Sequence, residues 1–570
     1  MSKEQAELRR WLEEVTDPEL SAELLSIRNE EKEVHERFYR SLEFGTGGLR
    51  GELGAGTNRM NIYTVRQATQ GFAAYLLTQN KAPSAAISYD SRHKSDIFAR
   101  ETARVLAANG IKVYLYPHLM PTPALSFAVL DRHCTGGVMV TASHNPARYN
   151  GYKAYAADGA QISGHVAAAV SAEIEKTDIF RDVKLADFEE ALADGRIEYI
   201  GDALIERYYA AVMAQALRPE LGKAAGLRLV YTPLNGSGLV PVMTVLKRIG
   251  HTDITVVPEQ EQPNGDFPTC PYPNPEILEA MQLGLNLCEK LGADLLLATD
   301  PDSDRVGTAV LQNGTPRLIS GNEMGVLLLD YICRTRLELH KMPENPVAVR
   351  SIVSTTMTDA IAAHYGVEMR QVLTGFKYIG EQIAHLEAEG HPERFIFGFE
   401  ESYGYLAGGY VRDKDAVVAS MLICEMAAWY KGQGKNLGEA LDDLYAQYGF
   451  YFNKVDSYTF PGSDGMEKMA ALMETLRTEL PIAIGGRAVT GHTDYESGIR
   501  YEDGEGKTPT GLPAANVMEF RLGKEGSLVA RPSGTEPKLK FYYSLRAADR
   551  PTAEKAYGEI KASVEDWLGL

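Results

Sequence analysis

Residues 85–141 read AAISYDSRHKSDIFARETARVLAANGIKVYLYPHLMPTPALSFAVLDRHCTGGVMVT, and their alternation of strand-like and helix-like segments decides the fold. The strand-like segments are short apolar runs, and the segments between them mix apolar with polar residues at helical spacing. Gly110 stands where the first helix is expected to end. This β-α-β-α-β order predicts a parallel sheet covered by helices. The predicted strands are 85–89, 111–116 and 137–141, and the predicted helices are 93–109 and 123–130.

The same order of elements returns twice farther along the chain. The repetition is one of plan and not of residue identity, so three α/β units of similar architecture are expected. The second unit has predicted strands at 227–232, 253–257 and 294–298 and predicted helices at 239–249 and 275–291. The third unit has predicted strands at 347–352, 368–373 and 395–397 and predicted helices at 356–365 and 378–388.

The two ends of the chain depart from this plan. Residues 3–43 are rich in Glu, Leu and Arg and predict a helix, which the glycine-rich segment FGTGGLRG at 44–51 ends. The last portion predicts an α+β domain with two amphipathic helices, a hairpin and a further strand. These elements are expected at 466–480, 551–567, 517–530 and 539–545. The expected domains are 1–205, 206–322, 323–448 and 449–570.

The composition is that of a globular protein with a strong negative charge. Of 570 residues, 44% are hydrophobic, and the formal net charge is −19. A chain this acidic is not expected to bind nucleic acid or an anionic membrane, although a local basic site could bind an anionic substrate. Five cysteines without a CxxC pair argue against a disulfide framework or a structural zinc site. Without an apolar signal segment or an apolar stretch of about 18 residues, a cytoplasmic protein is expected.

A first candidate functional loop has the sequence TASHNP at 141–146 and follows a predicted strand. Open α/β sheets bind their ligands at the carboxyl ends of the strands. In this position the hydroxyl of Ser143 can serve as a nucleophile or as a phosphoryl carrier. The plainer interpretation is a turn stabilised by Ser, Asn and Pro, and the loop alone leaves both interpretations open.

Three aspartates, Asp300, Asp302 and Asp304, alternate along the loop that follows the apolar run 294–298. Alternate side chains of an extended or curled segment point the same way, so the three carboxylates can converge on one cation. Acids this close repel one another without a cation, and Mg²⁺ prefers such oxygen ligands. An EF-hand calcium loop needs glycine at the sixth position, where Arg305 stands. The spacing therefore favours a magnesium site over a calcium loop or a solvated acidic turn.

Two further loops have the composition that a sugar phosphate requires. GFEESYG at 398–404 follows a predicted strand, and carboxylates beside a hydroxyl can bind sugar hydroxyls. Glu400 and Glu401 could also be the acid and base of a glycosidase, but adjacent residues rarely face one another across a bond. RPSGTEPK at 531–538 combines an arginine, hydroxyls and a glycine backbone, which suits a phosphate better than a plain hairpin turn.

The order of these four loops, TASHNP, DPDSDR, GFEES and RPSGTEP, resembles that of the α-D-phosphohexomutase superfamily. The resemblance spans essentially residues 40–570. FGTGGLRG and the N-terminal helix resemble the bacterial α-phosphoglucomutase branch of the phosphoglucomutase/phosphomannomutase family. The fold class that this implies is α/β, with four domains around a central cleft. Three of them are similar α/β domains with mixed sheets, and the C-terminal domain is α+β.

The resemblance also implies roles for individual residues. Ser143 matches the phosphoserine of the family, and one of its phosphate oxygens would complete the Mg²⁺ site of Asp300, Asp302 and Asp304. Pro301 and Ser303 stand where the family often has glycine between these acids. The residues near the phosphoserine are Arg50, His144 and Lys153. The substrate contacts are Glu400, Ser402, Arg305, Thr374 and Lys414, and the phosphate-binding loop is Arg531, Ser533, Gly534 and Thr535.

The activity that the resemblance implies is an intramolecular phosphotransfer of the isomerase class. It interconverts α-D-glucose 1-phosphate and D-glucose 6-phosphate through the phosphoserine, with glucose 1,6-bisphosphate as intermediate and activator. Mg²⁺ is the implied cofactor, small sugar phosphates are the implied ligands, and a monomer or homodimer is expected. Mannose and pentose phosphates are alternative substrates. Two other classes stay open: a serine-dependent phosphomonoesterase, and a non-catalytic sugar-phosphate sensor, which would need neither Ser143 nor the three aspartates.

Overall fold

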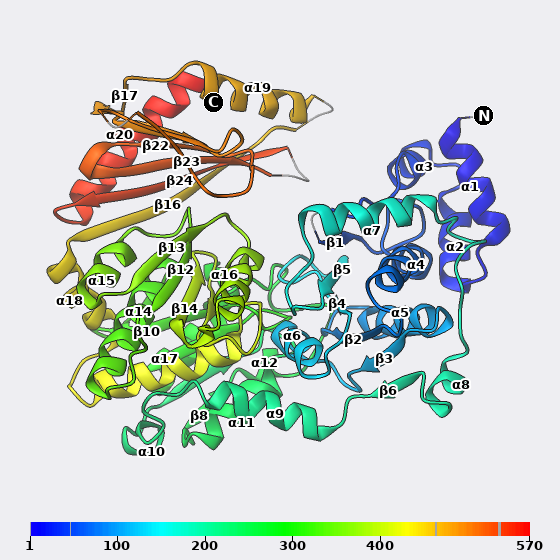
Figure 1. The fold of residues 1–570 in the computed structure, drawn as a ribbon, viewed down its shortest axis with the longest axis horizontal. Helices are drawn as coiled ribbons and strands as arrows, with labels where there is room; N and C mark the ends of the chain where they lie inside the picture. The colour runs from blue at the N-terminus through cyan, green and yellow to red at the C-terminus, as the bar shows by residue number, and fades with distance from the viewer. Residues whose placement is uncertain (1, 46, 462–463, 505, 534–536) are drawn as a thin grey trace. The chain divides into compact units, whose positions relative to one another are not determined.

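The computed structural model describes most of the chain (Figure 1), and the described residues divide into two units. In this part of the chain no helix is both long and apolar enough to cross a membrane. The described residues are 2–45, 47–461, 464–504, 506–533 and 537–570. The first unit consists of 1–320, 379–395 and 403–436, and the second of 321–378, 396–402 and 437–570.

The N-terminal segment forms separate short helices, so the prediction of one helix over 3–43 is wrong. A helix cannot continue through Pro18, because proline lacks an N–H group and its ring clashes with the preceding turn. Asp17 instead caps a new helix and accepts a hydrogen bond of 3.0 Å from the N–H of Leu20. Trp11 is fully buried in the core of this segment. The helices are α1 (Lys3–Glu14), α2 (Pro18–Ile27) and α3 (Glu31–Phe38).

The first sheet forms from the predicted strands, and two antiparallel additions make it mixed. β2 (Ser84–Tyr89) is parallel to β3 (Lys112–Leu115) and to β4 (Gly136–Val140). β5 (Tyr149–Ala156) is antiparallel to β4 and to β1 (Gly48–Glu52). The strand order is β1-β5-β4-β2-β3-β6. The other elements are β6 (Ile197–Tyr199), α4 (Ile62–Gln79), α5 (Ser95–Ala108), α6 (Thr122–Asp131), α7 (Gly164–Lys176), α8 (Phe188–Ala193) and α9 (Asp202–Met213).

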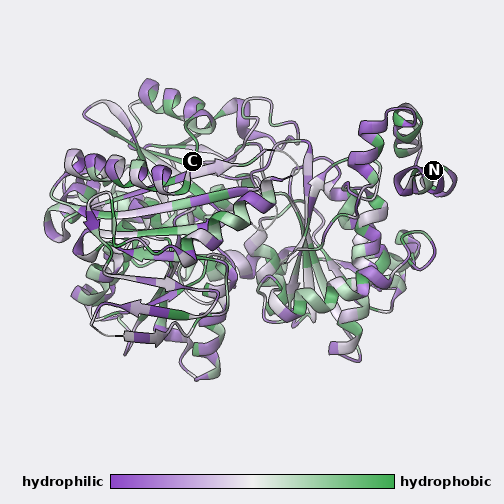
Figure 2. Cartoon of the chain, turned by 90° about the horizontal axis from the view of Figure 1, so that it is seen from above, coloured by the Kyte–Doolittle hydropathy of each residue, from purple (hydrophilic) through white to green (hydrophobic). Residues whose placement is uncertain are grey.

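The core of this sheet lies between the strands and the apolar faces of the helices. Phe72 of α4, Leu106 of α5 and Val138 of β4 belong to one cluster of buried side chains. In Figure 2 the strands in the part of the chain that carries the N-terminus are largely hydrophobic, and hydrophilic residues are frequent on the helices around them. Because the core fixes β4, the loop that directly follows it starts from a rigid support. This loop carries Ser143.

The second sheet repeats the plan and adds an antiparallel pair of strands that the sequence did not predict. β9 (Leu295–Thr299) is parallel to β7 (Leu229–Thr232) and antiparallel to β10 (Val306–Gln312). Every residue of β9 is buried, as expected of an apolar strand covered on both faces. The strand order is β11-β10-β9-β7-β8. The other elements are β8 (Ile254–Val256), β11 (Thr315–Ile319), α10 (Leu221–Ala224), α11 (Leu239–Arg248), α12 (Pro258–Glu261) and α13 (Leu278–Leu291).

Helix α17 (Ala416–Lys431) completes the first unit after the short strand β15 (Gly404–Leu406). The carboxylate of Asp415 caps this helix by accepting hydrogen bonds from the N–H groups of Val417 and Val418, at 2.7 and 3.2 Å. The helix is apolar and buried along nearly its whole length, as expected of an interior helix.

The third α/β segment contributes β12 (Val347–Ser351) and β13 (Glu368–Val372), which are parallel as predicted. β14 (Phe395–Glu400) is longer than the predicted strand 395–397, so Glu400 ends the strand and does not lie in the following loop. The strand extends because Phe399 is apolar and buried, with its ring against Gly325 of a neighbouring helix. The helices are α14 (Gly321–Glu338), α15 (Met357–Tyr365), α16 (Phe376–Ala388) and α18 (Leu437–Tyr448).

The described residues of the C-terminal portion form an antiparallel sheet with two α-helices, which confirms the predicted α+β domain type. The predicted hairpin pairs Met518 with Ala530. Its second strand is longer than predicted and includes Arg531. The strand order is β16-β24-β23-β22-β19-β20-β21. The elements are β16 (Phe450–Thr459), α19 (Gly465–Thr478), β17 (Ala483–Ile484), β18 (Arg487–Ala488), β19 (Gly491–Asp494), β20 (Ile499–Glu502), β21 (Gly506–Pro509), β22 (Met518–Arg521), β23 (Gly526–Pro532), β24 (Lys538–Ala547) and α20 (Arg550–Leu568).

Candidate active site

Ser143 lies in a buried loop directly after β4. Its backbone φ is 50°, in the left-handed region that residues other than glycine rarely adopt. Its hydroxyl donates a hydrogen bond of 2.9 Å to Oδ2 of Asp300, and Oγ lies 3.2 Å from Nδ1 of His144. The structure therefore brings the predicted phosphoserine position together with one of the predicted metal ligands.

The carboxylates of Asp300, Asp302 and Asp304 converge in the loop after β9. All three residues are buried, and one oxygen of each lies within 4.8 Å of the others. The loop is tightened at Asp300, whose Oδ1 accepts hydrogen bonds from the N–H groups of Asp304 and Arg305 at 3.1 and 3.0 Å. Oδ1 of Asp302 and Oδ1 of Asp304 are buried and have no hydrogen-bond partner among the described residues. Such oxygens fit a hard divalent cation such as Mg²⁺.

Two lysines place their ammonium groups against these carboxylates. Lys153 is on β5, and its Nζ lies 2.8 Å from Oδ2 of Asp302 and 3.6 Å from Oδ2 of Asp304. Lys414 Nζ lies 2.8 Å from Oδ2 of Asp304. The hydroxyl of Thr122 donates a further hydrogen bond of 2.9 Å to Oδ2 of Asp302. Lys414, which the resemblance implies as a substrate contact, therefore lies against the aspartate loop.

The titration behaviour of these groups follows from burial and from their charged neighbours. Burial and the carboxylates of Asp302 and Asp304 raise the pKa of Asp300 well above its usual range. Burial also acts to raise the pKa of Asp302, but the ammonium groups of Lys153 and Lys414 and the hydrogen bond with Asp300 together outweigh it, and the pKa of Asp302 is lowered. The raised pKa of Asp300 reflects its burial and the repulsion among the three neighbouring carboxylates, and a bound cation would relieve this repulsion.

Three more predicted residues lie around Ser143. Burial, followed by the guanidinium groups of Arg305 and Arg50, lowers the pKa of His144 well below its usual value. The imidazole beside the Ser143 hydroxyl is therefore neutral at pH 7. Arg50 is on β1, and its Nη1 donates a hydrogen bond of 3.5 Å to Oδ1 of Asn145. Arg305 follows the aspartate loop, and its Nη1 lies 2.5 Å from Oε1 of Glu276.

The second unit carries the predicted sugar-binding residues. Glu400 is buried at the end of β14, where its Oε1 accepts a hydrogen bond of 2.7 Å from the N–H of Gly375. Ser402 is half-buried in the following turn. The hydroxyl of Thr374, just before Gly375, is buried without a hydrogen-bond partner among the described residues. The structure thus brings the segment around Thr374 onto the end of β14, as expected of two parts of one site.

The predicted phosphate-binding loop begins at the end of β23. Arg531 is half-buried on this strand, and the N–H of Ser533 donates a hydrogen bond of 2.8 Å to the carbonyl of Lys538. Burial and the carboxylate of Glu401 raise the pKa of Tyr542 to about 12, although the guanidinium of Arg531 acts in the opposite direction. The predicted residues Gly534 and Thr535 lie outside the described residues.

Two buried residues that the sequence analysis did not single out contact the loop that carries Ser143. Asp90 and Arg92 follow β2, and the side chains of both are fully buried. Nη1 of Arg92 donates hydrogen bonds of 3.0 Å to the carbonyl oxygens of Pro146 and Tyr149. Because they directly follow a predicted strand, the strand-end position that singled out the other loops could have identified them.

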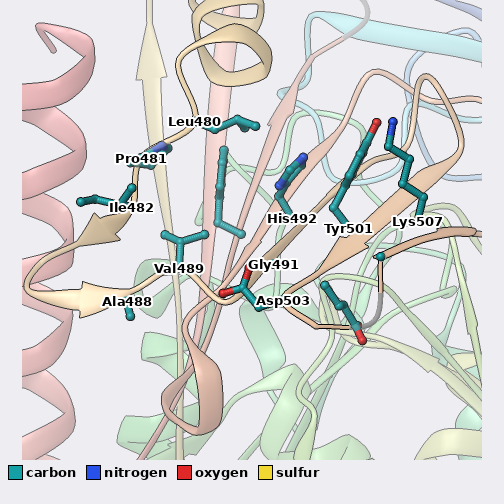
Figure 3. Close-up of a pocket in the computed structure, with 13 residues that line it drawn as sticks. Leu480, Pro481, Ile482, Ala488, Val489, Gly491, His492, Tyr501, Asp503 and Lys507 are labelled. Atoms are coloured by element: carbon teal, nitrogen blue, oxygen red, sulfur yellow. The ribbon is translucent and has the colours of Figure 1, made fainter.

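A surface pocket of about 630 Å³ lies elsewhere in the C-terminal domain (Figure 3). The rings of His492 and Tyr501 stack in it with their centroids 4.4 Å apart, and Lys507 lies beside Tyr501. Leu480 and Ile482 form part of its apolar wall. None of the predicted site residues that the structure describes lines this pocket.

Three segments of the chain match the sequence models of one family. The family is described as phosphoglucomutase/phosphomannomutase, and the models are those of its alpha/beta/alpha domains I, II and III. Together the matched segments cover more than half of the chain. They are residues 41–180, 206–314 and 320–448.

Individual relatives and a solved structure agree with this match. The chain is 38% identical over 510 residues to the phosphoglucomutase of Staphylococcus haemolyticus, which covers 89% of this chain and 91% of that protein. It is 36% identical over 537 residues to that of Staphylococcus epidermidis, with 94% and 96% covered. The fold is similar to that of pp63/parafusin, a phosphoglucomutase from Paramecium, with a TM-score of 0.69 and 17% identity over 93% of this chain and 96% of that chain.

These matches confirm the superfamily and the fold class that the four loops predicted. The mixed sheets of the three α/β segments and the β-rich C-terminal domain are those expected of that superfamily. The chain therefore belongs to the phosphoglucomutase/phosphomannomutase family.

Proposed function

We propose that this protein is a phosphoglucomutase that interconverts α-D-glucose 1-phosphate and D-glucose 6-phosphate. The observation that carries the proposal is the hydrogen bond of 2.9 Å between the Ser143 hydroxyl and Asp300, within a buried cluster of three carboxylates. A serine hydroxyl needs such neighbours, because alone it is a weak nucleophile and a poor phosphoryl carrier. The names of the two staphylococcal relatives support glucose phosphates as substrates.

In the proposed reaction, phosphorylated Ser143 transfers its phosphoryl group to a free hydroxyl of the bound sugar phosphate. The bond between Oγ and phosphorus breaks, and a bond between the sugar oxygen and phosphorus forms. The sugar hydroxyl loses its proton, and Oγ regains one. The product is glucose 1,6-bisphosphate, which turns over and returns its other phosphoryl group to Ser143 by the reverse of the same step.

The residues around Ser143 support this transfer electrostatically. Asp300, Asp302 and Asp304 would hold a divalent cation, which when bound supplies positive charge against the transferring phosphoryl group. Lys153 and Lys414 add two ammonium groups at the same carboxylates. His144 is placed to exchange a proton with Oγ of Ser143, because Nδ1 of its imidazole lies 3.2 Å from that oxygen.

A second group of residues is proposed to bind the substrate. Glu400 and Ser402 would bind sugar hydroxyls, with Thr374 beside them. Arg531 and Ser533 would bind the phosphate that is not reacting, because a guanidinium pairs two of its N–H groups with a phosphate. Arg50 and Arg305 would contact the phosphoryl group near Ser143. The proposed domains keep the boundaries 1–205, 206–322, 323–448 and 449–570.

A product assay tests the proposal against its alternatives. The protein is incubated with glucose 1-phosphate, Mg²⁺ and a trace of glucose 1,6-bisphosphate, and the products are identified by ³¹P NMR. Glucose 6-phosphate without free phosphate supports the mutase. Free phosphate as the main product would instead identify a phosphomonoesterase, and unchanged substrate would identify a sensor.

Substrate choice within the family needs a second comparison. The same assay with mannose 1-phosphate and ribose 1-phosphate, each with its own bisphosphate, ranks the three sugars by kcat/KM. The proposal expects glucose 1-phosphate to have the highest value. A higher value for ribose or mannose 1-phosphate would reassign the substrate but keep the phosphoserine mechanism.

A further inference from the structure

Arg92 is an arginine of the interior, next to the Ser143 loop. Its side chain is fully buried, and the centroid of the Phe267 ring lies 5.0 Å from the guanidinium carbon. We infer that Arg92 is the positioning residue of the Ser143 loop: its guanidinium holds the backbone of this loop so that the serine hydroxyl stays at the transfer position. The inference rests on the proposed function of Ser143.

The guanidinium binds the loop through main-chain carbonyl groups. Nη2 donates to the carbonyl oxygens of Ser143 and Asn145. Nη1 donates hydrogen bonds of 3.0 Å to the carbonyl oxygens of Pro146 and Tyr149. One planar group thus joins four carbonyl groups between the serine and the first residue of β5. Arginine is suited to this because its five N–H donors lie in a fixed plane.

The N–H group of Ser143 is connected, through Thr141, to the buried ion pair between Arg92 and Asp90. Nε of Arg92 lies 3.4 Å from Oδ2 of Asp90. That carboxylate oxygen accepts a hydrogen bond of 2.6 Å from the hydroxyl of Thr141, and Thr141 Oγ1 accepts one of 2.7 Å from the N–H of Ser143. The C=O of Ser143 therefore accepts a hydrogen bond from Arg92, and its N–H is linked to Asp90 through Thr141.

The backbone of Ser143 needs this support. Its φ of 50° is a conformation that a serine adopts only where its surroundings impose it. If the carbonyl contacts were lost, the residue could relax toward negative φ, and its hydroxyl would turn away from Asp300. A displacement of about 1 Å at a reacting group can reduce the rate about 100-fold, so the loop geometry matters for catalysis.

Arg92→Lys is the decisive variant, because lysine keeps the positive charge but not the planar set of donors. Arg100→Lys is the matched control, since Arg100 is an exposed arginine of α5 that pairs with Glu189 at 2.8 Å. For each protein, phosphorylation of Ser143 is measured by peptide mass spectrometry after incubation with glucose 1,6-bisphosphate. kcat is then expressed per phosphorylated serine, and KM for glucose 1-phosphate and Tm are measured alongside.

The inference expects kcat per phosphorylated serine of R92K to fall at least about tenfold, with KM within about threefold of the wild type. Unchanged kcat per phosphorylated serine, even with a lower Tm, would show that Arg92 only stabilises the fold and would overturn the inference. If R92K does not fold, the double variant D90N/R92M, which removes both buried charges, takes the same test. Failure of the wild type to phosphorylate Ser143 would overturn the proposed function itself.

Discussion

The hydroxyl of Ser143 donates a hydrogen bond of 2.9 Å to the carboxylate of Asp300, although 157 positions separate the two residues in the chain. They follow strands of two different sheets, β4 and β9. A phosphoryl group on this serine would bring a charge of about −1.5 to −2 beside a buried carboxylate. Phosphorylation of Ser143 and cation binding at the aspartates are therefore expected to support each other.

Replacing Ser143 by alanine should abolish phosphotransfer, because it removes the group that carries the phosphoryl. We expect S143A to fold and to bind glucose 1-phosphate, with kcat at least about a thousandfold lower. Wild-type protein should carry one phosphoryl group on the 141–146 peptide by mass spectrometry. Ser26 is an exposed serine of α2, and the control variant S26A should behave as the wild type. Near-normal activity of S143A would contradict the mechanism.

Removal of divalent cation should stop the reaction, because three buried carboxylates would be left to repel the phosphoryl group. EDTA is expected to abolish activity, and added Mg²⁺ to restore it. Asp302→Asn should weaken Mg²⁺ binding at least about tenfold in calorimetry, since one charged ligand is lost. The control D253N changes an exposed aspartate and should leave the affinity unchanged. Full activity in EDTA would refute the assignment of the metal site.

Arg531→Ala should weaken substrate binding without unfolding the protein, because Arg531 is proposed to bind the phosphate that is not reacting. Losing a charged partner of a bound anion costs about 2–5 kcal/mol. KM for both glucose phosphates is therefore expected to rise steeply, with Tm near that of the wild type. Arg546 is an exposed arginine on β24, and R546A is the matched control. Equal KM values for R531A and R546A would argue against this role.

Asp415→Asn should change how stability depends on pH. Burial raises the pKa of Asp415 to about 6, although the hydroxyls of Tyr410 and Tyr208 donate to it at 2.6 and 3.0 Å. The folded state therefore favours the protonated form. The contribution of Asp415 to the free energy of unfolding is fully present below its unfolded pKa near 4 and is lost as the pH rises through its folded pKa of about 6. Relative to D415N, the wild type should lose about 2–3 kcal/mol of unfolding free energy between pH 4 and pH 7.

Urea unfolding at a series of pH values measures this difference. The control is D549N, which changes an exposed aspartate that caps α20. Its side-chain hydrogen bond to Thr552 lowers the pKa of Asp549, so the stability that it contributes is present at higher pH and is lost as the pH falls. Opposite pH trends for D415N and D549N are expected. A D415N profile parallel to that of the wild type would show that Asp415 does not titrate in this range.

Local patterns predicted most elements of the α/β segments because strands and helices there alternate with clear turn signals. They failed where a single residue interrupts a favourable composition. Pro18 divides the predicted N-terminal helix, and its effect exceeds the helix propensity of the Glu- and Leu-rich sequence around it. They also placed the end of β14 too early, because the burial of Phe399 depends on a helix far away in the chain.

The sequence by itself determined the α/β plan, the C-terminal domain type and the four loops, because each is written in residues that are neighbours in the chain. Only the tertiary structure decided that Ser143 donates a hydrogen bond to Asp300 and that Lys414 pairs with Asp304. It also decided that Arg92 donates hydrogen bonds to the backbone of the Ser143 loop. These contacts join strand ends that are distant in sequence. The packing of buried sheets and helices sets their distances, and a linear pattern does not encode that packing.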